Sequence, residues 1–176
     1  MTAEPIMNTG EGAASGEEIM TYQEDVFRVC LGFSRNPVEA EDLCQDVYLK
    51  ALRKIGTVQD RGALKAWLLR IARNTCLDQQ KRGRLFRLFK RSVARDDARV
   101  GPAQEGEASA RERLAELKEA VRRLPAKQRE VFVLREYGHL SYAELAGTLG
   151  LKQGTVMSRL SRARKAVFGQ MNRGKS

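Results

Sequence analysis

The sequence has few of the residues from which catalytic and metal sites are usually built. Its 176 residues include one histidine, His139, and three cysteines, Cys30, Cys44 and Cys76, none of them in a CxxC pair. An odd number of widely spaced cysteines supports neither a disulfide framework nor a zinc site, so we expect all three to be buried core residues. Without a glycine-rich phosphate loop or a cluster of His, Cys and acidic residues, neither enzymatic activity nor a cofactor is predicted.

Long apolar runs are also missing. No segment approaches the length that spans a bilayer, and the amino-terminal residues lack the basic start and apolar middle of a signal peptide. We therefore expect a cytoplasmic protein without membrane insertion. Residues 1–17 are rich in Gly, Ala and Glu and show no periodicity, which predicts a disordered acidic amino terminus.

The charge is strongly positive and unevenly distributed. The formal net charge is +10, yet residues 1–25 contain six acidic residues and no basic one. Residues 61–95 contain eleven basic residues and a single acidic one, Asp78, while residues 151–176 contain seven basic residues and no acidic one. Two separate basic segments predict two contacts with nucleic acid.

Apolar residues recur at steps of three and four along the chain, and no alternating pattern predicts a strand. The sequence therefore predicts an all-α protein, with helices over residues 19–33, 38–55 and 63–82 in a first domain of residues 18–91. Residues 92–108 lack periodicity and contain Gly-Pro, so we expect a flexible linker there, before a second helical domain of residues 109–173.

The helix predicted over residues 38–55 has two different faces. Its apolar stripe includes Leu43, Val47 and Leu52, which we expect to be buried. The opposite edge is acidic and consists of Glu41, Asp42, Gln45 and Asp46. On a chain otherwise so basic, this edge is either a docking surface for another protein or a solvated helix face.

Residues 141–165 have the pattern of a helix-turn-helix. Ser141 and Glu144 form a capping box at the start of a short helix, and Gly150 supplies the turn. A second helix starts near Lys152, with a buried stripe of Val156, Leu160, Ala163, Val167 and Met171. At 100° per residue, Met157, Ser158, Ser161, Arg162 and Lys165 point away from that stripe, and Arg159 and Arg164 flank it. Such a face suits a DNA major groove, although a helical hairpin with a solvated basic face has the same pattern.

Three segments carry a resemblance to a known family. They are AEDLCQDVYLKALR, LKAWLLRIARNTCLDQQKR and LPAKQREVFVLREYGHLSYAELAGTLGLKQGTVMSRLSRARK. In this order they resemble the extracytoplasmic-function sigma factors of bacterial RNA polymerase, in the sigma-70 family, from about residue 20 to 170. The resemblance implies a region 2 bundle of three to four helices, a linker, and a four-helix region 4 with the helix-turn-helix. The implied partners are core RNA polymerase (clamp helices of the largest subunit, flap of the second-largest), promoter DNA and an anti-sigma factor.

The resemblance also implies roles for individual residues. Glu41, Asp42, Gln45 and Asp46 match the surface that binds core polymerase. Asn74 occupies a base-contacting position for the minus-10 element, within the set Thr57, Gln59, Asp60, Arg61, Arg70, Arg73, Asn74, Asp78 and Arg82. The minus-35 element is matched by Lys152, Thr155, Met157, Ser158, Arg159, Ser161, Arg162, Arg164 and Lys165. Met157 departs from the family, which commonly carries Lys or Arg there.

Two other functions fit parts of the pattern. A stand-alone helix-turn-helix regulator would bind an operator without polymerase, but it leaves the second basic segment and the acidic helix edge unexplained. A membrane-surface or RNA-binding protein would use RGRLFRLFKR, residues 82–91, as a basic amphipathic segment. Co-purification with core polymerase and liposome flotation distinguish these functions from initiation.

Overall fold

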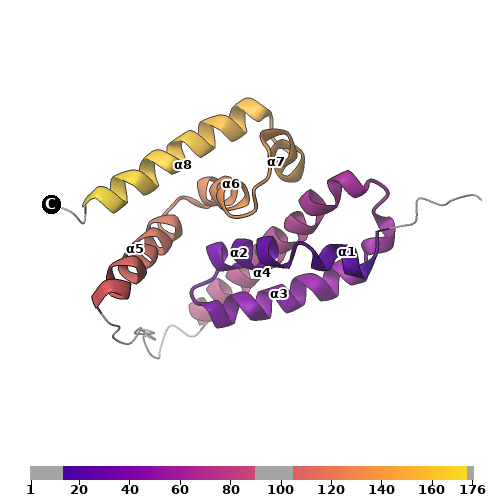
Figure 1. Ribbon diagram of the computed structural model, residues 1–176, viewed down its shortest axis with the longest axis horizontal. Coiled ribbons are helices and arrows are strands. Elements are labelled where there is room, and N and C mark those ends of the chain that lie inside the picture. Colours follow the sequence, from indigo (N-terminus) through magenta and orange to yellow (C-terminus); the bar gives the residue numbers. More distant parts are fainter. Residues whose placement is uncertain (1–13, 90–104, 174–176) are drawn as a thin grey trace, which may run out of the picture.

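The described residues form two helical bundles packed side by side (Figure 1). The structure is a computed structural model that describes residues 14–89 and 105–173. Over these residues all regular elements are helices, as the sequence predicts: α1 (Gly16–Met20), α2 (Gln23–Phe33), α3 (Pro37–Leu52), the 3₁₀ turns η1 (Ile55–Thr57) and η2 (Arg61–Ala63), α4 (Leu64–Phe89), α5 (Glu105–Arg122), α6 (Ala126–Glu136), α7 (Tyr142–Leu149) and α8 (Gln153–Arg173).

The first bundle consists of α1 to α4, with α2, α3 and α4 packed against one another. Asn36 caps α3 by accepting a hydrogen bond from the Glu39 N–H at 2.8 Å, and Pro37 occupies the first turn, where its missing N–H costs nothing. Val29, Val47 and Leu68 are fully buried at the centre of this bundle. Burial of each such side chain contributes about 1.5–3 kcal/mol, so packing holds these helices together.

The three cysteines lie on the three helices of this core. Cys30 and Cys76 are buried, as expected, while Cys44 is half-buried. The neighbouring thiol of Cys30, together with burial, raises the pKa of Cys44 well above its usual range. A thiol held protonated in this way is a poor nucleophile, which fits a packing role.

The helix boundaries differ from the sequence prediction at several points. The continuous helix expected over residues 19–33 is wrong, because α1 ends at Met20 and α2 begins at Gln23. Ser15 and Glu18 form a capping box that starts α1 inside the segment expected to be disordered, of which residues 1–13 lie outside the described residues. Leu52 was expected in the buried stripe but is 52% exposed, since α3 ends there and its last turn leaves the core.

The largest difference between a predicted and an observed helix end is at the carboxyl end of α4. This helix was expected to end at Arg82, but it continues to Phe89 and includes most of the segment RGRLFRLFKR. Gly83 costs about 1 kcal/mol relative to Ala in a helix, and the Leu and Arg residues around it favour helix, so nothing in the sequence stops the chain there. Similarly, α5 begins at Glu105, within the expected linker, whose residues 92–104 lie outside the described residues.

The second bundle consists of α5 to α8. Its core contains Val121, Leu134, Leu145 and Leu160, all fully buried or nearly so. Pro125 precedes α6, and α8 packs across α5, α6 and α7 (Figure 1). This arrangement holds the helix-turn-helix on a rigid base and leaves the far side of α8 open.

The two bundles meet along a close seam between α2 and α4 on one side and α6 and α7 on the other. Two glycines permit this approach. A β-carbon on Gly32 would lie 2.8 Å from both Tyr137 Cδ2 and Val133 Cγ1, and one on Gly138 would lie 2.7 Å from Leu69 Cδ1. Any larger residue at either position would push the helices apart.

Candidate nucleic-acid interface

The turn between α7 and α8 is shaped by the predicted cap and glycine. The Ser141 hydroxyl accepts a hydrogen bond from the Glu144 N–H at 3.2 Å, and the Glu144 carboxylate accepts one from the Ser141 N–H at 2.7 Å. These contacts with Ser141 hold the pKa of Glu144 below its usual range. Gly150 then ends α7 in the left-handed conformation, with φ +63°. The predicted capping box and turn are therefore confirmed.

One side of α8 is buried and the other is open. Val156, Leu160, Ala163 and Val167 are buried, and Met171 is half-buried, so the predicted stripe faces the bundle. Among the predicted minus-35 residues, six are exposed and three are half-buried. The exposed ones are Lys152, Met157, Ser161, Arg162, Arg164 and Lys165, and the half-buried ones are Thr155, Ser158 and Arg159. Hydroxyl, guanidinium and ammonium groups on one helix face can contact both base edges and phosphates in a major groove.

Arg164 differs from the other basic residues of this face. Its Nη2 lies 2.6 Å from Glu136 Oε1, and its Nε donates to the same oxygen at 2.9 Å. The Glu136 carboxylate raises the pKa of Arg164 and ties its side chain to α6. Arg159, Arg162 and Lys165 have no ion-pair partner among the described residues, and of these three Arg162 and Lys165 are exposed.

The predicted minus-10 residues lie on the loop before α4 and along α4 itself. Asp60 Oδ1 accepts the Gly62 N–H at 2.8 Å and shapes η2. The set is exposed except for Arg73, and its exposed members are Thr57, Gln59, Asp60, Arg61, Arg70, Asn74, Asp78 and Arg82. A cleft of about 460 Å³ separates this loop from α7, with Asp60, Trp67 and Arg70 on one wall and Glu144 and Thr148 on the other. Trp67 packs against the core and also lines this cleft.

Arg73 is the predicted DNA contact that faces the other bundle. Its Nε donates to Glu130 Oε2 of α6 at 2.8 Å, and its Nη1 donates to Asn74 Oδ1 at 2.7 Å. The structure therefore brings Arg73 and Asn74 together but holds both next to α6. In this arrangement, the Nε and Nη2 groups of Arg73 are both engaged by Glu130.

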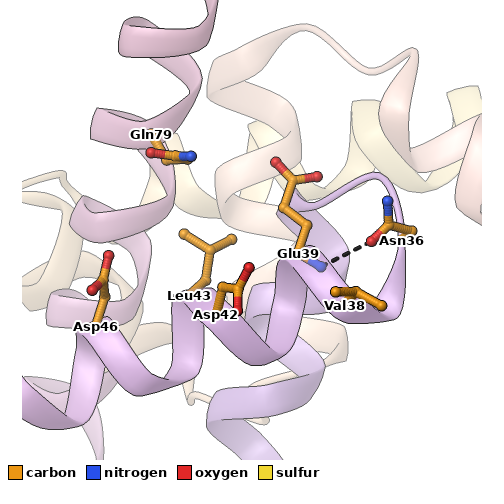
Figure 2. Close-up of a pocket in the computed structure, with 7 residues that line it drawn as sticks. All are labelled: Asn36, Val38, Glu39, Asp42, Leu43, Asp46 and Gln79. Atoms are coloured by element: carbon orange, nitrogen blue, oxygen red, sulfur yellow. Dashed lines mark hydrogen bonds between the residues drawn. The ribbon is translucent and has the colours of Figure 1, made fainter. Parts of the chain in front are cut away.

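The acidic edge of α3 forms a separate surface. Glu41, Asp42, Gln45 and Asp46 are all exposed, as predicted. Figure 2 shows Asp42 and Asp46 on successive turns of α3, with Gln79 of α4 across from them, around a hollow of about 320 Å³. Exposed apolar side chains, Val38, Leu49 and Leu52, lie on the same helix. Acidic and apolar groups side by side are suited to binding another protein.

Within residues 14–89 and 105–173, no group of three His, Cys, Asp or Glu side chains is arranged to hold a metal ion. In the same described ranges, no helix combines the length and apolar character that crossing a membrane requires. His139 lies exposed at the seam with φ 56°, and its Nε2 is 3.3 Å from Arg28 Nη1.

The contacts between the two bundles were not predicted from the sequence. Tyr137, Glu130 and His139 touch the first bundle, yet none belongs to a local pattern that marks an interface. Gly32 and Gly138 were the available signals, because both interrupt otherwise helical or apolar stretches. Their partners in the other bundle lie far away in the chain, so the sequence alone did not connect them.

Two helical bundles, one with a helix-turn-helix and one with an exposed basic helix, define a DNA-binding protein of transcription. Residues 19–86 match the family Sigma-70 region 2, and residues 114–167 match Sigma-70, region 4. The chain is 32% identical to ECF RNA polymerase sigma factor SigC of Mycobacterium tuberculosis over 90% of its own length and 84% of that protein. It thus belongs to the extracytoplasmic-function (ECF) sigma factors: alternative sigma factors that associate with core RNA polymerase and direct it to promoters.

Two further relatives agree with this assignment. ECF RNA polymerase sigma factor SigE of Mycolicibacterium smegmatis is 35% identical, with 90% of this chain and 63% of that protein covered. Among solved structures, the sigma factor RpoE from Bartonella quintana, determined with the anti-sigma factor NepR, has 29% identity and a TM-score of 0.74. That match covers 89% of this chain and 95% of the other. Both bundles of the present fold therefore occur in a sigma factor of known structure.

Proposed function

We propose that this sigma factor uses three separate surfaces for the steps of initiation. The acidic edge of α3 (Glu41, Asp42, Gln45 and Asp46) binds the clamp helices of the largest polymerase subunit, and region 4 contacts the flap of the second-largest subunit. The exposed face of α8 reads the minus-35 element. The loop before α4 and the exposed face of α4 capture the minus-10 element, with Asn74 contacting a flipped base. The observation that carries this proposal is the polar, basic face of α8 above its buried stripe.

The chemistry of the minus-10 surface supports this division of tasks. Extruding a base from a duplex costs a few kcal/mol, which hydrogen bonds and stacking must offset. The amide of Asn74 supplies both a donor and an acceptor, and the basic residues Arg70 and Arg82 are exposed along the same helix. Arg73 joins this surface once it leaves Glu130, so minus-10 binding is coupled to separation of the two regions.

We further propose a domain division and a regulator. Region 2 comprises residues 18–91 and region 4 residues 109–173, with residues 92–108 as the linker; α5 of region 4 already begins within that span, at Glu105. Because RpoE of Bartonella quintana was solved in complex with an anti-sigma factor, we infer that a protein of that kind also controls this chain. The protein acts in the cytoplasm as an initiation factor, without enzymatic activity or cofactor of its own.

Run-off transcription with core polymerase, in the presence and absence of this protein, tests the proposal. A library of genomic promoter fragments should give discrete new start sites that share upstream motifs. Sequence-specific DNA binding without any new start would contradict it and favour a stand-alone helix-turn-helix regulator. In the same assay, an Arg162→Ala protein should keep core binding and lose selectivity for the minus-35 element.

A further inference from the structure

A second cleft at the seam is lined by arginines that the proposed steps of initiation do not use. It has a volume of about 430 Å³ and borders the hollow of Figure 2, since Glu39 and Gln79 line both. The end of α2, the start of α3 and the second half of α4 form one wall, and α5 and α6 form the other. Region 2 contributes Arg35 and Arg84, region 4 contributes Arg122 and Arg129, and Glu39 is the one carboxylate among the lining residues.

The positive charge of this cleft is only partly compensated. Arg122 pairs with Glu119, at 2.6 Å from Nε to Oε2. Glu39 accepts the backbone N–H of Arg35 at 2.8 Å. The guanidinium groups of Arg35 and Arg84 have no ion-pair partner among the residues that the structure describes. Two exposed cations therefore face the cleft without a fixed counter-charge.

Arg129 is the most constrained of the four. It is half-buried, its Nη2 donates to the Leu124 carbonyl at 3.3 Å, and its Nε is buried without a hydrogen-bond partner. Burial and the like charge of Arg122 lower the pKa of Arg129. A cation that is partly removed from water and placed near another cation is stabilised by any anion that enters beside it.

The shape of the cleft favours a small anion over a long one. Its volume lies within the range of pockets that hold small ligands. Guanidinium groups bind phosphate oxygens through two parallel hydrogen bonds, which makes arginine the side chain best suited to phosphate recognition. A nucleic-acid strand, in contrast, is held along an extended groove.

We propose that this cleft binds a small phosphate-bearing anion, with the dimensions of a diphosphate group, and that the anion bridges region 2 and region 4. Arg35 and Arg84 hold it from region 2, and Arg122 and Arg129 hold it from region 4. The bound anion stabilises the packed arrangement of the two regions, because only that arrangement brings the four arginines together. Binding of the anion does not depend on the function proposed above. Only an effect of the anion on transcription initiation rests on that proposed function.

Isothermal titration of the full chain with inorganic pyrophosphate, at constant ionic strength, tests this proposal. Wild-type protein should bind one pyrophosphate in a saturable manner. Arg84→Gln, in region 2, and Arg122→Gln, in region 4, should each weaken binding at least about tenfold, as expected for the loss of one charge-assisted contact. Arg53→Gln removes the same charge from the exposed end of α3 and is the matched control, with a change below about twofold.

Several outcomes would overturn the proposal. A binding heat that does not saturate with pyrophosphate, or that is equal in wild type and Arg84→Gln, would show a general ionic-strength effect. Loss of binding in only one of the two variants would show that one region holds the anion alone. A single-stranded oligonucleotide that depends on Arg84 as strongly as pyrophosphate does would identify a nucleic-acid contact instead. None of these results requires transcription, so failure here is distinct from failure of the proposed function.

Discussion

Arg73 in α4 and Glu130 in α6 form an ion pair that joins region 2 to region 4. The side chains of both residues are mostly buried, with 24% and 14% exposed. Arg73 also donates to Asn74, the residue expected to contact a flipped base. The same side chain therefore serves the packed arrangement of the free protein and the surface proposed for the minus-10 element. We expect the two uses to compete, because the guanidinium group of Arg73 is engaged by Glu130.

Replacing Glu130 should favour the proposed contact of Arg73 with the minus-10 element. Glu130→Gln keeps the shape of the side chain but removes its charge, so we expect a loss of about 1 kcal/mol in unfolding free energy. Because Arg73 is released, abortive initiation at a minus-10-dependent promoter should increase at limiting core polymerase. Urea unfolding and abortive transcript yield measure the two effects.

Glu116→Gln is the control for this experiment, since Glu116 is exposed on α5 and has no ion-pair partner among the described residues. It should change neither quantity. Equal initiation by Glu130→Gln and wild type, at equal occupancy of core, would show that the ion pair does not restrain Arg73.

The close approach at Gly32 gives a second test of the seam. In Gly32→Ala the new methyl group would meet Tyr137 and Val133 at 2.8 Å. We expect a net destabilisation of about 1–3 kcal/mol from overpacking, even though Ala favours a helix by about 1 kcal/mol. Gly169→Ala in α8 meets no atom within 4 Å and should instead be stabilising. Thermal unfolding distinguishes the two, and a stabilised Gly32→Ala protein would contradict the packed seam.

Truncation of Arg162 on α8 tests its proposed contact with the minus-35 element. Arg162 is exposed and lacks an ion-pair partner among the described residues, so Arg162→Ala should reduce discrimination for the minus-35 element by about 1–3 kcal/mol. Lys127→Ala, an exposed change outside the helix-turn-helix, is the control and should leave discrimination unchanged. Competition binding with promoter and mutated minus-35 sequences measures the ratio. An equal loss on all sequences would identify Arg162 as a phosphate contact.

The capping box of α7 predicts a pH dependence. The pKa of Glu144 is lower in the folded protein than its usual value, so the ionised carboxylate stabilises the fold. This contribution is complete above the pKa of an unfolded glutamate, about 4.3, and is lost as the pH falls through the lowered folded value. The unfolding free energy of Glu144→Gln should therefore fall below wild type at pH 7 and approach it on acidification. Glu112→Gln, at an exposed site, should show no such convergence.

Local signals in the sequence predicted the elements that carry the proposed contacts with DNA. Ser141, Glu144 and Gly150 act through neighbours within a few residues, so a capping box and a turn could be recognised without a structure. The end of α4 could not, because Gly83 resembles a stop signal but costs too little to end a helix whose neighbours favour it.

The relation between the two regions was also beyond local patterns. Gly32 interrupts a helical stretch, but its neighbours in the sequence do not show that Tyr137 packs against it. In the sequence, Arg73 resembles the other basic residues of its helix. Its pairing with Glu130, 57 positions later, is a tertiary contact that local patterns do not indicate. Helical periodicity predicted on which helix face the proposed DNA-binding residues lie. Whether their side chains are engaged by the other bundle depends on tertiary contacts, which periodicity does not predict.

The Arg73–Glu130 pair has a consequence for how counterions influence promoter binding. Added salt weakens DNA binding, because cations released from the phosphates must return to a more concentrated solution. The same salt screens the ion pair at the seam and so makes opening of the two regions easier. The measured dependence of promoter affinity on salt should therefore be shallower than the number of phosphate contacts requires, and Glu130→Gln should make it steeper.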